Sequence, residues 1–253
     1  MSKKTILFRT ALLVTLVISL LSANVSVNAA PKLFTSSDEP TRLVELYTSE
    51  GCSSCPSAER WISKFTDNKD LWRTIIPINF HVDYWDYLGW KDPFSFSEFS
   101  QRQRTYKRQG NTKNVATPGF VISGEGWNGW FRGRDLPGAF INPKNELQAV
   151  LDEQKIEVKY ATSQKKRLDV HVAILGFGIT TEVKSGENRG KNLAHDFVVI
   201  GYEKSRLKRD DQLQTAIMDL PDVVEAVTTG RSLVVWVSEQ GNPEPIQVLG
   251  GWL

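Results

Sequence analysis

The sequence predicts an α/β domain over residues 42–155, followed by a β-rich, sandwich-like domain over residues 156–253. Two observations carry this prediction. In the first part, short apolar runs are separated by segments whose apolar residues recur at helical spacing. In the second part, short stretches alternate between apolar and polar residues, and turn signals separate them. Strands that alternate with helices are typical of α/β domains, whereas closely spaced short strands are typical of β-rich ones.

In the first part, the apolar run Leu43 to Tyr47 predicts a strand, and Ala58, Trp61 and Phe65 share one face of a helix that follows it. Asn142 as N-cap, with Pro143 at the first helical position, indicates the start of a later helix. The expected elements are strands at 43–47, at 75–83 and after 117–118, with helices at 52–66, 95–109 and 142–154.

The second part is expected to consist mainly of strands. The alternation in residues 156–160 and 168–174 predicts two of them, and 197–200 and 233–237 are β-rich. A short helix is expected at 210–219.

The first 29 residues have the pattern of a secretory signal peptide. Lys3, Lys4 and Arg9 precede the apolar stretch 11–21, and Val27-Asn28-Ala29 is a small-residue cleavage site. An uncleaved anchor helix is the alternative. We therefore expect an exported protein, periplasmic or extracellular, with a flexible arm at 30–41 and no membrane contact after cleavage.

Charge gives no indication of a nucleic-acid partner. The leader holds three basic residues and no acidic one, so 28 basic and 29 acidic residues remain, a net charge of −1. A nucleic-acid-binding domain would carry a clear basic excess.

The two cysteines of the chain form the motif Cys52-Ser53-Ser54-Cys55, directly after the first predicted strand. A thiol at a helix N-terminus is acidified by the unpaired N–H groups there, and this spacing in this context is typical of a thioredoxin-like redox motif. Cys52 is the expected attacking thiol and Cys55 the resolving thiol. A stable surface disulfide is the alternative, but one pair closing so small a loop adds little stability.

A second group of candidate residues lies at the end of the strand 75–83. His81, Asp83, Tyr84 and Trp85 are expected to line a substrate pocket beside the cysteines, because sites form at strand ends in α/β sheets. Two alternatives remain. The aromatic residues can simply cap a core around a buried histidine, or His81 can join both cysteines in a copper(I) site.

Several of these motifs resemble those of one family. They are the segments Glu45 to Pro56, His81 to Phe94 and Thr117-Pro118, with a weaker echo in Gly186-Glu-Asn-Arg-Gly190. With them the chain resembles the secreted, thioredoxin-like "domain of unknown function 1223" family, which has no established reaction.

The resemblance implies a thioredoxin-like first domain and a sandwich-like second one. It also implies a cis peptide bond before Pro118, which would pack beside the cysteines and, with Thr117, shape a peptide groove. Glu45 would be a buried acid that moves protons for the resolving thiol; a solvated strand carboxylate is the alternative.

From these observations we expect an exported thiol–disulfide oxidoreductase that acts on protein or small-molecule thiols, with a redox partner protein and no organic cofactor or metal. Two alternatives stay open. One is a non-catalytic binding protein that uses the aromatic loop 84–94, and the other is a copper(I) metallochaperone.

Overall fold

The computed structural model describes residues 30–253 apart from residues 139 and 143. The predicted signal peptide, residues 1–29, lies outside the described residues, as does Pro143. No helix within the described part of the chain is long and apolar enough to cross a membrane.

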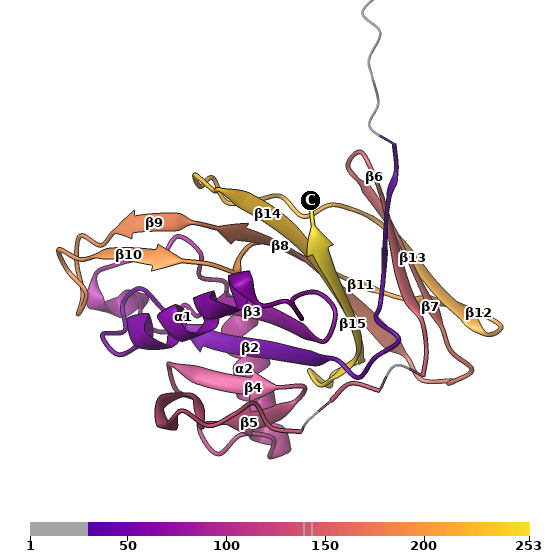
Figure 1. Ribbon diagram of the computed structural model, residues 1–253, viewed down its shortest axis with the longest axis horizontal. Helices are drawn as coiled ribbons and strands as arrows, with labels where there is room; N and C mark the ends of the chain where they lie inside the picture. The colour runs from indigo at the N-terminus through magenta and orange to yellow at the C-terminus, as the bar shows by residue number, and fades with distance from the viewer. Residues whose placement is uncertain (1–29, 139, 143) are drawn as a thin grey trace, which may run out of the picture.

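The main sheet has eight strands and draws on both halves of the chain (Figure 1). β3 runs parallel to its two neighbours, β2 and β11, and the other neighbouring pairs are antiparallel. In order across the sheet the strands are β15 (Pro245–Trp252), β14 (Gly230–Glu239), β8 (Leu168–Phe177), β11 (Val198–Arg206), β3 (Ile75–His81), β2 (Arg42–Thr48), β4 (Gly119–Ile122) and β5 (Glu125–Trp127).

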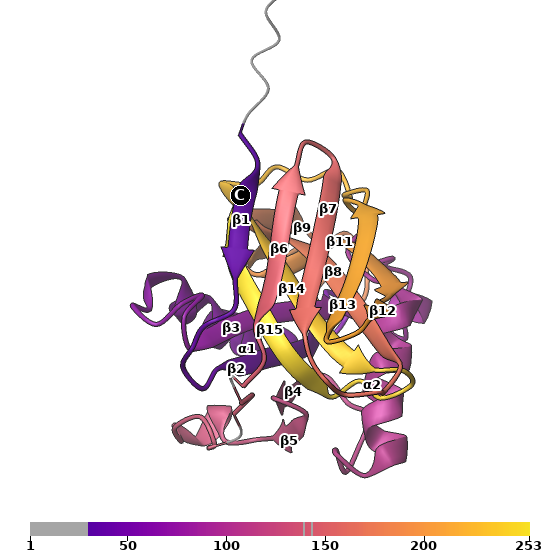
Figure 2. The same ribbon diagram turned by 90° about the vertical axis from the view of Figure 1, so that its right-hand side faces the viewer.

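A second, five-stranded sheet is antiparallel throughout and lies over one face of the main sheet, in front of β15, β14 and β8 in Figure 2. Its order is β1 (Lys32–Thr35), β6 (Leu147–Asp152), β7 (Lys155–Ala161), β13 (Leu213–Asp219) and β12 (Lys208–Asp210). A separate two-stranded sheet pairs β9 (Ile179–Glu182) with β10 (Asn192–His195).

Strand β8 shows how the two layers are held together, because all of its residues are buried. Val172 and Ile174 belong to the core shared with the five-stranded sheet, whereas Ala173 and Leu175 belong to the core on the other face. Alternate residues of a strand point to opposite faces, so this one strand contributes to both cores.

Two α-helices lie among the described residues, α1 (Cys55–Ser63) and α2 (Ser97–Gln109), together with three short 3-10 helices, η1 (Lys64–Asp67), η2 (Asp86–Leu88) and η3 (Trp130–Arg132). Glu45 of β2 binds Arg102 of α2, and Thr48 of the same strand binds Glu59 of α1. Because odd and even strand positions face opposite ways, the two α-helices cover opposite faces of β2.

The predicted fold class, an α/β thioredoxin-like domain followed by a β-rich domain, is wrong. The described chain is mostly β-sheet, and the main sheet runs without a break from β2–β5 into four strands of the second half. The junction is Val198 of β11 paired with Asn79 of β3, which makes β3 a fully buried inner strand. The sequence cannot show this pairing, because the two segments are far apart along the chain. The predicted division between residues 155 and 156 stays a prediction.

Three segments differ from their expected conformations. The helix expected at 142–154 is replaced by β6, which forms a hairpin with β7, and the helix expected at 210–219 by β13, which pairs with β7 on its other side. The expected arm at 30–41 contains β1, paired with β6. In each case, pairing with a neighbouring strand decides the conformation of a segment whose local pattern is ambiguous.

Candidate functional site

Cys52 and Cys55 form a disulfide with 5.5 Å between their Cα atoms. The sequence predicts that Cys52 lies at the start of the helix. In the structure α1 begins at Cys55, and Cys52 lies in the turn before the helix. Both residues are buried, Cys52 with 1% and Cys55 with 0% of its surface exposed. The surface disulfide considered as an alternative is therefore not what the structure shows.

The loop before β4 covers one side of the disulfide. The Thr117–Pro118 peptide bond is cis, as predicted. The carbonyl oxygen of Thr117 lies 3.7 Å from the Cys52 sulfur, and the indole N–H of Trp85 donates a 2.7 Å hydrogen bond to the Thr117 hydroxyl. Trp85 also packs over Gly51, where an added Cβ would lie 3.1 Å from the tryptophan Cβ. Of the predicted pocket residues, Trp85 thus reaches the cysteine turn.

A second loop, residues 186–190, covers the other side, and we call it the cover loop. The side-chain amide of Asn188 donates hydrogen bonds to the carbonyl oxygens of Glu50, at 2.8 Å, and Cys52, at 2.9 Å. The backbone N–H of Ser53 donates to the Glu187 carboxylate at 2.9 Å. The side chain of Ser53, and then this backbone hydrogen bond, lower the pKa of that exposed group. This loop is the weak fourth motif of the sequence, and its contact with the cysteine turn was not predicted.

A groove of about 720 Å³ begins next to the cysteine turn, although neither cysteine is among its lining residues. Ser54 and Pro118 line it at this end. The hydroxyl oxygen of Ser54 lies 3.4 Å from the Cys52 sulfur. Trp127, Trp130 and Phe131 give it an aromatic wall. His81, Asp83, Tyr84 and Trp85 are not among its lining residues, so the groove differs from the predicted pocket.

The structure places Asp83 and Tyr84, two further predicted pocket residues, against α2 and not in the groove. Asp83 exchanges hydrogen bonds with Ser100 at the start of α2. The hydroxyl of Tyr84 donates to Gln103 of the same helix at 3.0 Å, and burial raises the pKa of Tyr84 to about 12. These residues therefore fix α2 to the end of β3.

Glu45 is neither solvated nor bonded to a cysteine. Arg102 holds both of its oxygens with hydrogen bonds of 2.8 and 2.9 Å, and the hydroxyls of Tyr47 and Tyr106 donate to it at 2.7 and 2.8 Å. All four residues are buried. The carboxylate is thus the acceptor of a buried ion pair that attaches α2 to β2.

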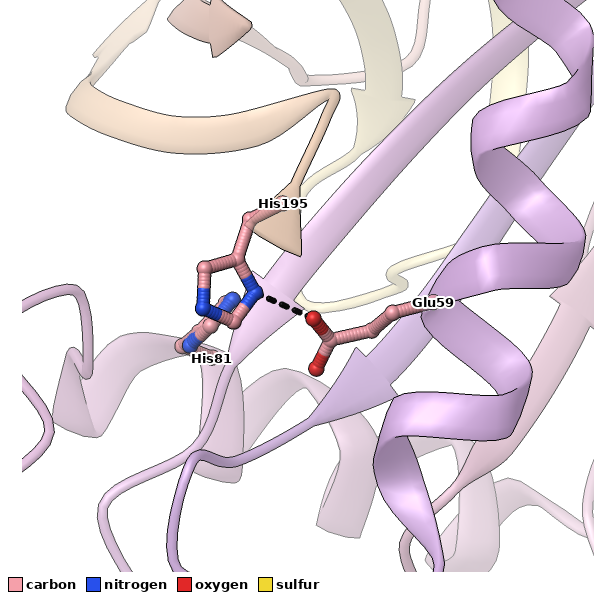
Figure 3. Close-up of side chains that lie close together, drawn as sticks. All are labelled: Glu59, His81 and His195. Carbon is pink, nitrogen blue, oxygen red and sulfur yellow. Dashed lines mark hydrogen bonds and ion pairs between the residues drawn. The ribbon is translucent and has the colours of Figure 1, made fainter. Parts of the chain in front are cut away.

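Beneath the cysteine turn lies a buried polar cluster made up of Glu50, Glu59, His81, Asp92 and His195, of which only His81 was among the predicted site residues. Glu59 contacts Nδ1 of His195 (Figure 3), and Nε2 of His195 lies 3.2 Å from Glu50. Nδ1 of His81 lies 2.7 Å from Asp92. Glu59 lies one helical turn after Cys55 in the sequence, and neither it nor His195 was among the predicted site residues.

The charges in this cluster shift one another's pKa values. Burial disfavours the protonated form of His195, but Glu59 and Glu50 outweigh it and raise the pKa to about 10. Burial likewise opposes charge on His81, but Asp92 raises its pKa above the usual value. Burial also opposes the charge on Glu59, but His195 lowers its pKa. Imidazolium–carboxylate pairs therefore hold the cluster together in the absence of any ligand.

The cluster also bears on the copper(I) alternative, which groups His81 with the two cysteines. The structure groups His81 with Glu59 and His195 instead, and both sulfur atoms are used in the disulfide. Thiolate sulfur is what would attract copper(I), so this arrangement does not form that site.

Comparison with known proteins gives a family and a fold. No curated protein matches the chain. A crystal structure of protein AGR_C_4864 from Agrobacterium tumefaciens matches with a TM-score of 0.57 and 24% identity, over 86% of this chain and 96% of that one. HBP35 of Porphyromonas gingivalis matches with a TM-score of 0.55 and 13% identity, over 86% and 76%. At these identities the two structures show similarity of fold alone. A family model described as "Protein of unknown function (DUF1223)" matches residues 43–238, and the chain belongs to that family.

Proposed function

We propose that the protein is a thiol–disulfide oxidoreductase whose redox centre is the Cys52–Cys55 pair, and that it acts outside the cytosol, in the periplasm or beyond the cell. The observation that carries the proposal is the position of the pair. The disulfide joins a turn to the first residue of α1, and a groove of about 720 Å³ begins beside it at Ser54.

The chemistry needs no group beyond the two cysteines. In the reducing direction, the Cys52 thiolate attacks a substrate disulfide, forming a mixed disulfide and releasing one substrate thiolate. The Cys55 thiolate then attacks the Cys52 sulfur, which reforms the protein disulfide and releases the second substrate thiolate. Two electrons pass to the substrate, and each released thiolate takes up a proton from solvent. The oxidising direction is the reverse, with a substrate dithiol as electron donor, and a redox partner protein restores the starting state.

The groove indicates the class of substrate. At one end Ser54 places its hydroxyl near the Cys52 sulfur and Pro118 lies in the lining, and the other wall is aromatic. An extended peptide fits such a surface, because its backbone can pair near the polar end while an apolar side chain packs on the tryptophans. We therefore favour a cysteine-containing peptide segment over a small thiol. Glu45 has no part in the proposal, because Arg102 holds both of its oxygens.

One observation favours a second candidate, a non-catalytic binding protein. Both cysteines are buried, and an unreactive structural disulfide is typically buried too. In that case the groove would bind its peptide without any exchange, and the disulfide would only hold the turn to α1.

Trapping of a mixed disulfide separates the two candidates. We expect Cys55→Ser to accumulate a covalent adduct with a cysteine peptide supplied as its disulfide, because the resolving thiol is missing. Cys52→Ser is the matched control and should form none. The redox proposal is wrong if neither variant forms an adduct and wild type shows no turnover, while the peptide still binds.

A further inference from the structure

Three side chains of the buried cluster converge from different elements (Figure 3). Glu59 comes from α1, His81 from the end of β3 and His195 from the end of β10. One nitrogen or oxygen atom of each lies within 4.8 Å of the corresponding atoms of the other two. The three side chains are shielded from water, since none has more than 2% of its surface exposed. Two imidazoles and one carboxylate form a donor set that suits zinc and related divalent ions.

Two of the three side chains are also oriented by a hydrogen bond to a further partner. Asp92 lies 2.7 Å from Nδ1 of His81. The Thr48 hydroxyl donates a 2.5 Å hydrogen bond to Oε1 of Glu59, the oxygen that does not contact His195. Nε2 of His195 lies 3.2 Å from Glu50 but makes no hydrogen bond among the described residues. His81 thus has the arrangement of a metal-bound histidine, whose nitrogen not bound to the ion donates to a carboxylate that fixes the ring.

An independent observation concerns Nε2 of His81. It is fully buried and has no hydrogen-bond partner among the described residues. A buried polar atom without a partner is costly. When the ring gives up its second proton and keeps the one on Nδ1, directed at Asp92, Nε2 presents a lone pair to the interior, so binding of a cation there would release a proton. A cation bound at this atom removes that cost.

We infer that Glu59, His81 and His195 bind one divalent transition-metal ion of the zinc type. The ion would be bound through a Glu59 oxygen, Nε2 of His81 and Nδ1 of His195, and so would lie where Glu59 and His195 now touch. Ligand bonds of about 2.0–2.2 Å require this pair to separate. Because α1, β3 and the β9–β10 sheet each supply one ligand, the ion would cross-link them beneath the cysteine turn. The inference goes beyond the proposed redox function, since no cysteine belongs to the donor set.

Zinc retention tests the inference. Purified protein is stripped with a chelator, incubated with zinc chloride, dialysed and analysed for metal by mass spectrometry. We expect about one zinc per chain in wild type and, for His81→Gln and His195→Gln, binding weaker by roughly 100-fold or more. His171→Gln is the matched control, because His171 is the third histidine of the chain and is also buried, and its ring nitrogens bond Tyr202 and Ser238. It should retain zinc, as should the double variant Cys52→Ser, Cys55→Ser.

Melting curves with and without zinc distinguish a variant that has lost zinc binding from one that has failed to fold. Zinc should raise the melting temperature of wild type and His171→Gln, and raise that of Glu59→Gln much less, because glutamine keeps the volume but lacks the charge. Three results would overturn the inference: no zinc retained by wild type, equal zinc loss in His171→Gln and His81→Gln, or zinc loss in the double cysteine variant.

Discussion

We predict that the cover loop limits access to the disulfide, and Asn188→Ala tests this directly. The substitution removes two hydrogen bonds that tie residues 186–190 to the cysteine turn, at 2.8 and 2.9 Å. The carbonyl oxygen of Glu50 loses its partner in a buried position, which costs about 1–3 kcal/mol. The carbonyl oxygen of Cys52 keeps a bond from the N–H of Cys55, so its loss is nearer 1 kcal/mol.

The closed state should therefore lose about 2–4 kcal/mol relative to the opened loop. Since 1.4 kcal/mol is a factor of about ten, the open population should rise by roughly 30-fold to several hundred-fold. When opening and closing are faster than reaction, the rate of reduction follows this population.

The assay is the reduction of the Cys52–Cys55 disulfide by excess dithiothreitol, followed by alkylation of the free thiols and mass measurement. Glu187→Gln is the control on the same loop, because it weakens a single exposed bond to Ser53 and should change the rate by about threefold or less. If Asn188→Ala lowers the stability of the protein as expected but its Cys52–Cys55 disulfide is reduced at the wild-type rate, the cover loop does not limit access to the disulfide.

Three further predictions concern stability. Arg102→Met leaves the Glu45 carboxylate buried without its cation and should lower the free energy of unfolding in urea by about 3–5 kcal/mol. Arg104→Met, a change at an exposed arginine of the same helix, should lower it by about 0.5 kcal/mol or less. Equal losses in the two variants would contradict a stabilising role for the buried ion pair. Burial, with Arg102 nearby, holds the pKa of His171 well below its usual 6.5, so below pH 6.5 the unfolded chain binds the proton more readily and stability falls with falling pH. His171→Leu should flatten that slope by up to about 1.4 kcal/mol per pH unit in chelator-treated protein, and an unchanged slope would contradict the assignment. Thr117→Val removes the acceptor of a 2.7 Å indole hydrogen bond and should cost about 1 kcal/mol in the same urea assay; no measurable loss would show that this bond does not hold the two loops together.

The elements that the sequence predicts well are those whose pattern reflects burial next to the site. β2 and β3 are buried on both faces, and their apolar runs indicate this without any knowledge of neighbours. The helix after Cys52 was expected over 52–66 and is found from Cys55, within the usual uncertainty of a helix boundary. The cysteine pair and the cis bond before Pro118 were likewise predicted.

The fold class could not be predicted, because it depends on pairing between distant strands. Nothing local in Val198 indicates that it will pair with Asn79 and join the two halves into one sheet. Residues 147–152 show the same problem at short range. Their apolar residues are compatible with a helix when the segment is considered alone. In the fold a two-residue turn connects the segment to β7, and pairing with β7 makes it a strand.

The buried cluster was missed for a similar reason. Glu59 and His195 are 136 residues apart, and a single histidine in a β-rich segment is usually structural. The cover loop shows the intermediate case, since its motif was noticed but its contact with Cys52 depends on the tertiary fold. The spacing of residues along the sequence thus reveals sites that are formed by one segment of the chain, and not sites that are formed by several distant segments.

The reduction potential of the Cys52–Cys55 pair, measured by equilibrating the protein in thiol redox buffers, is the most direct test of the proposed redox function. A value above about −270 mV would place the pair in the range of known thiol–disulfide oxidoreductases, as we predict. A value below about −300 mV, the range of disulfides that resist the glutathione pool, would contradict the proposal and favour a binding protein with a structural disulfide.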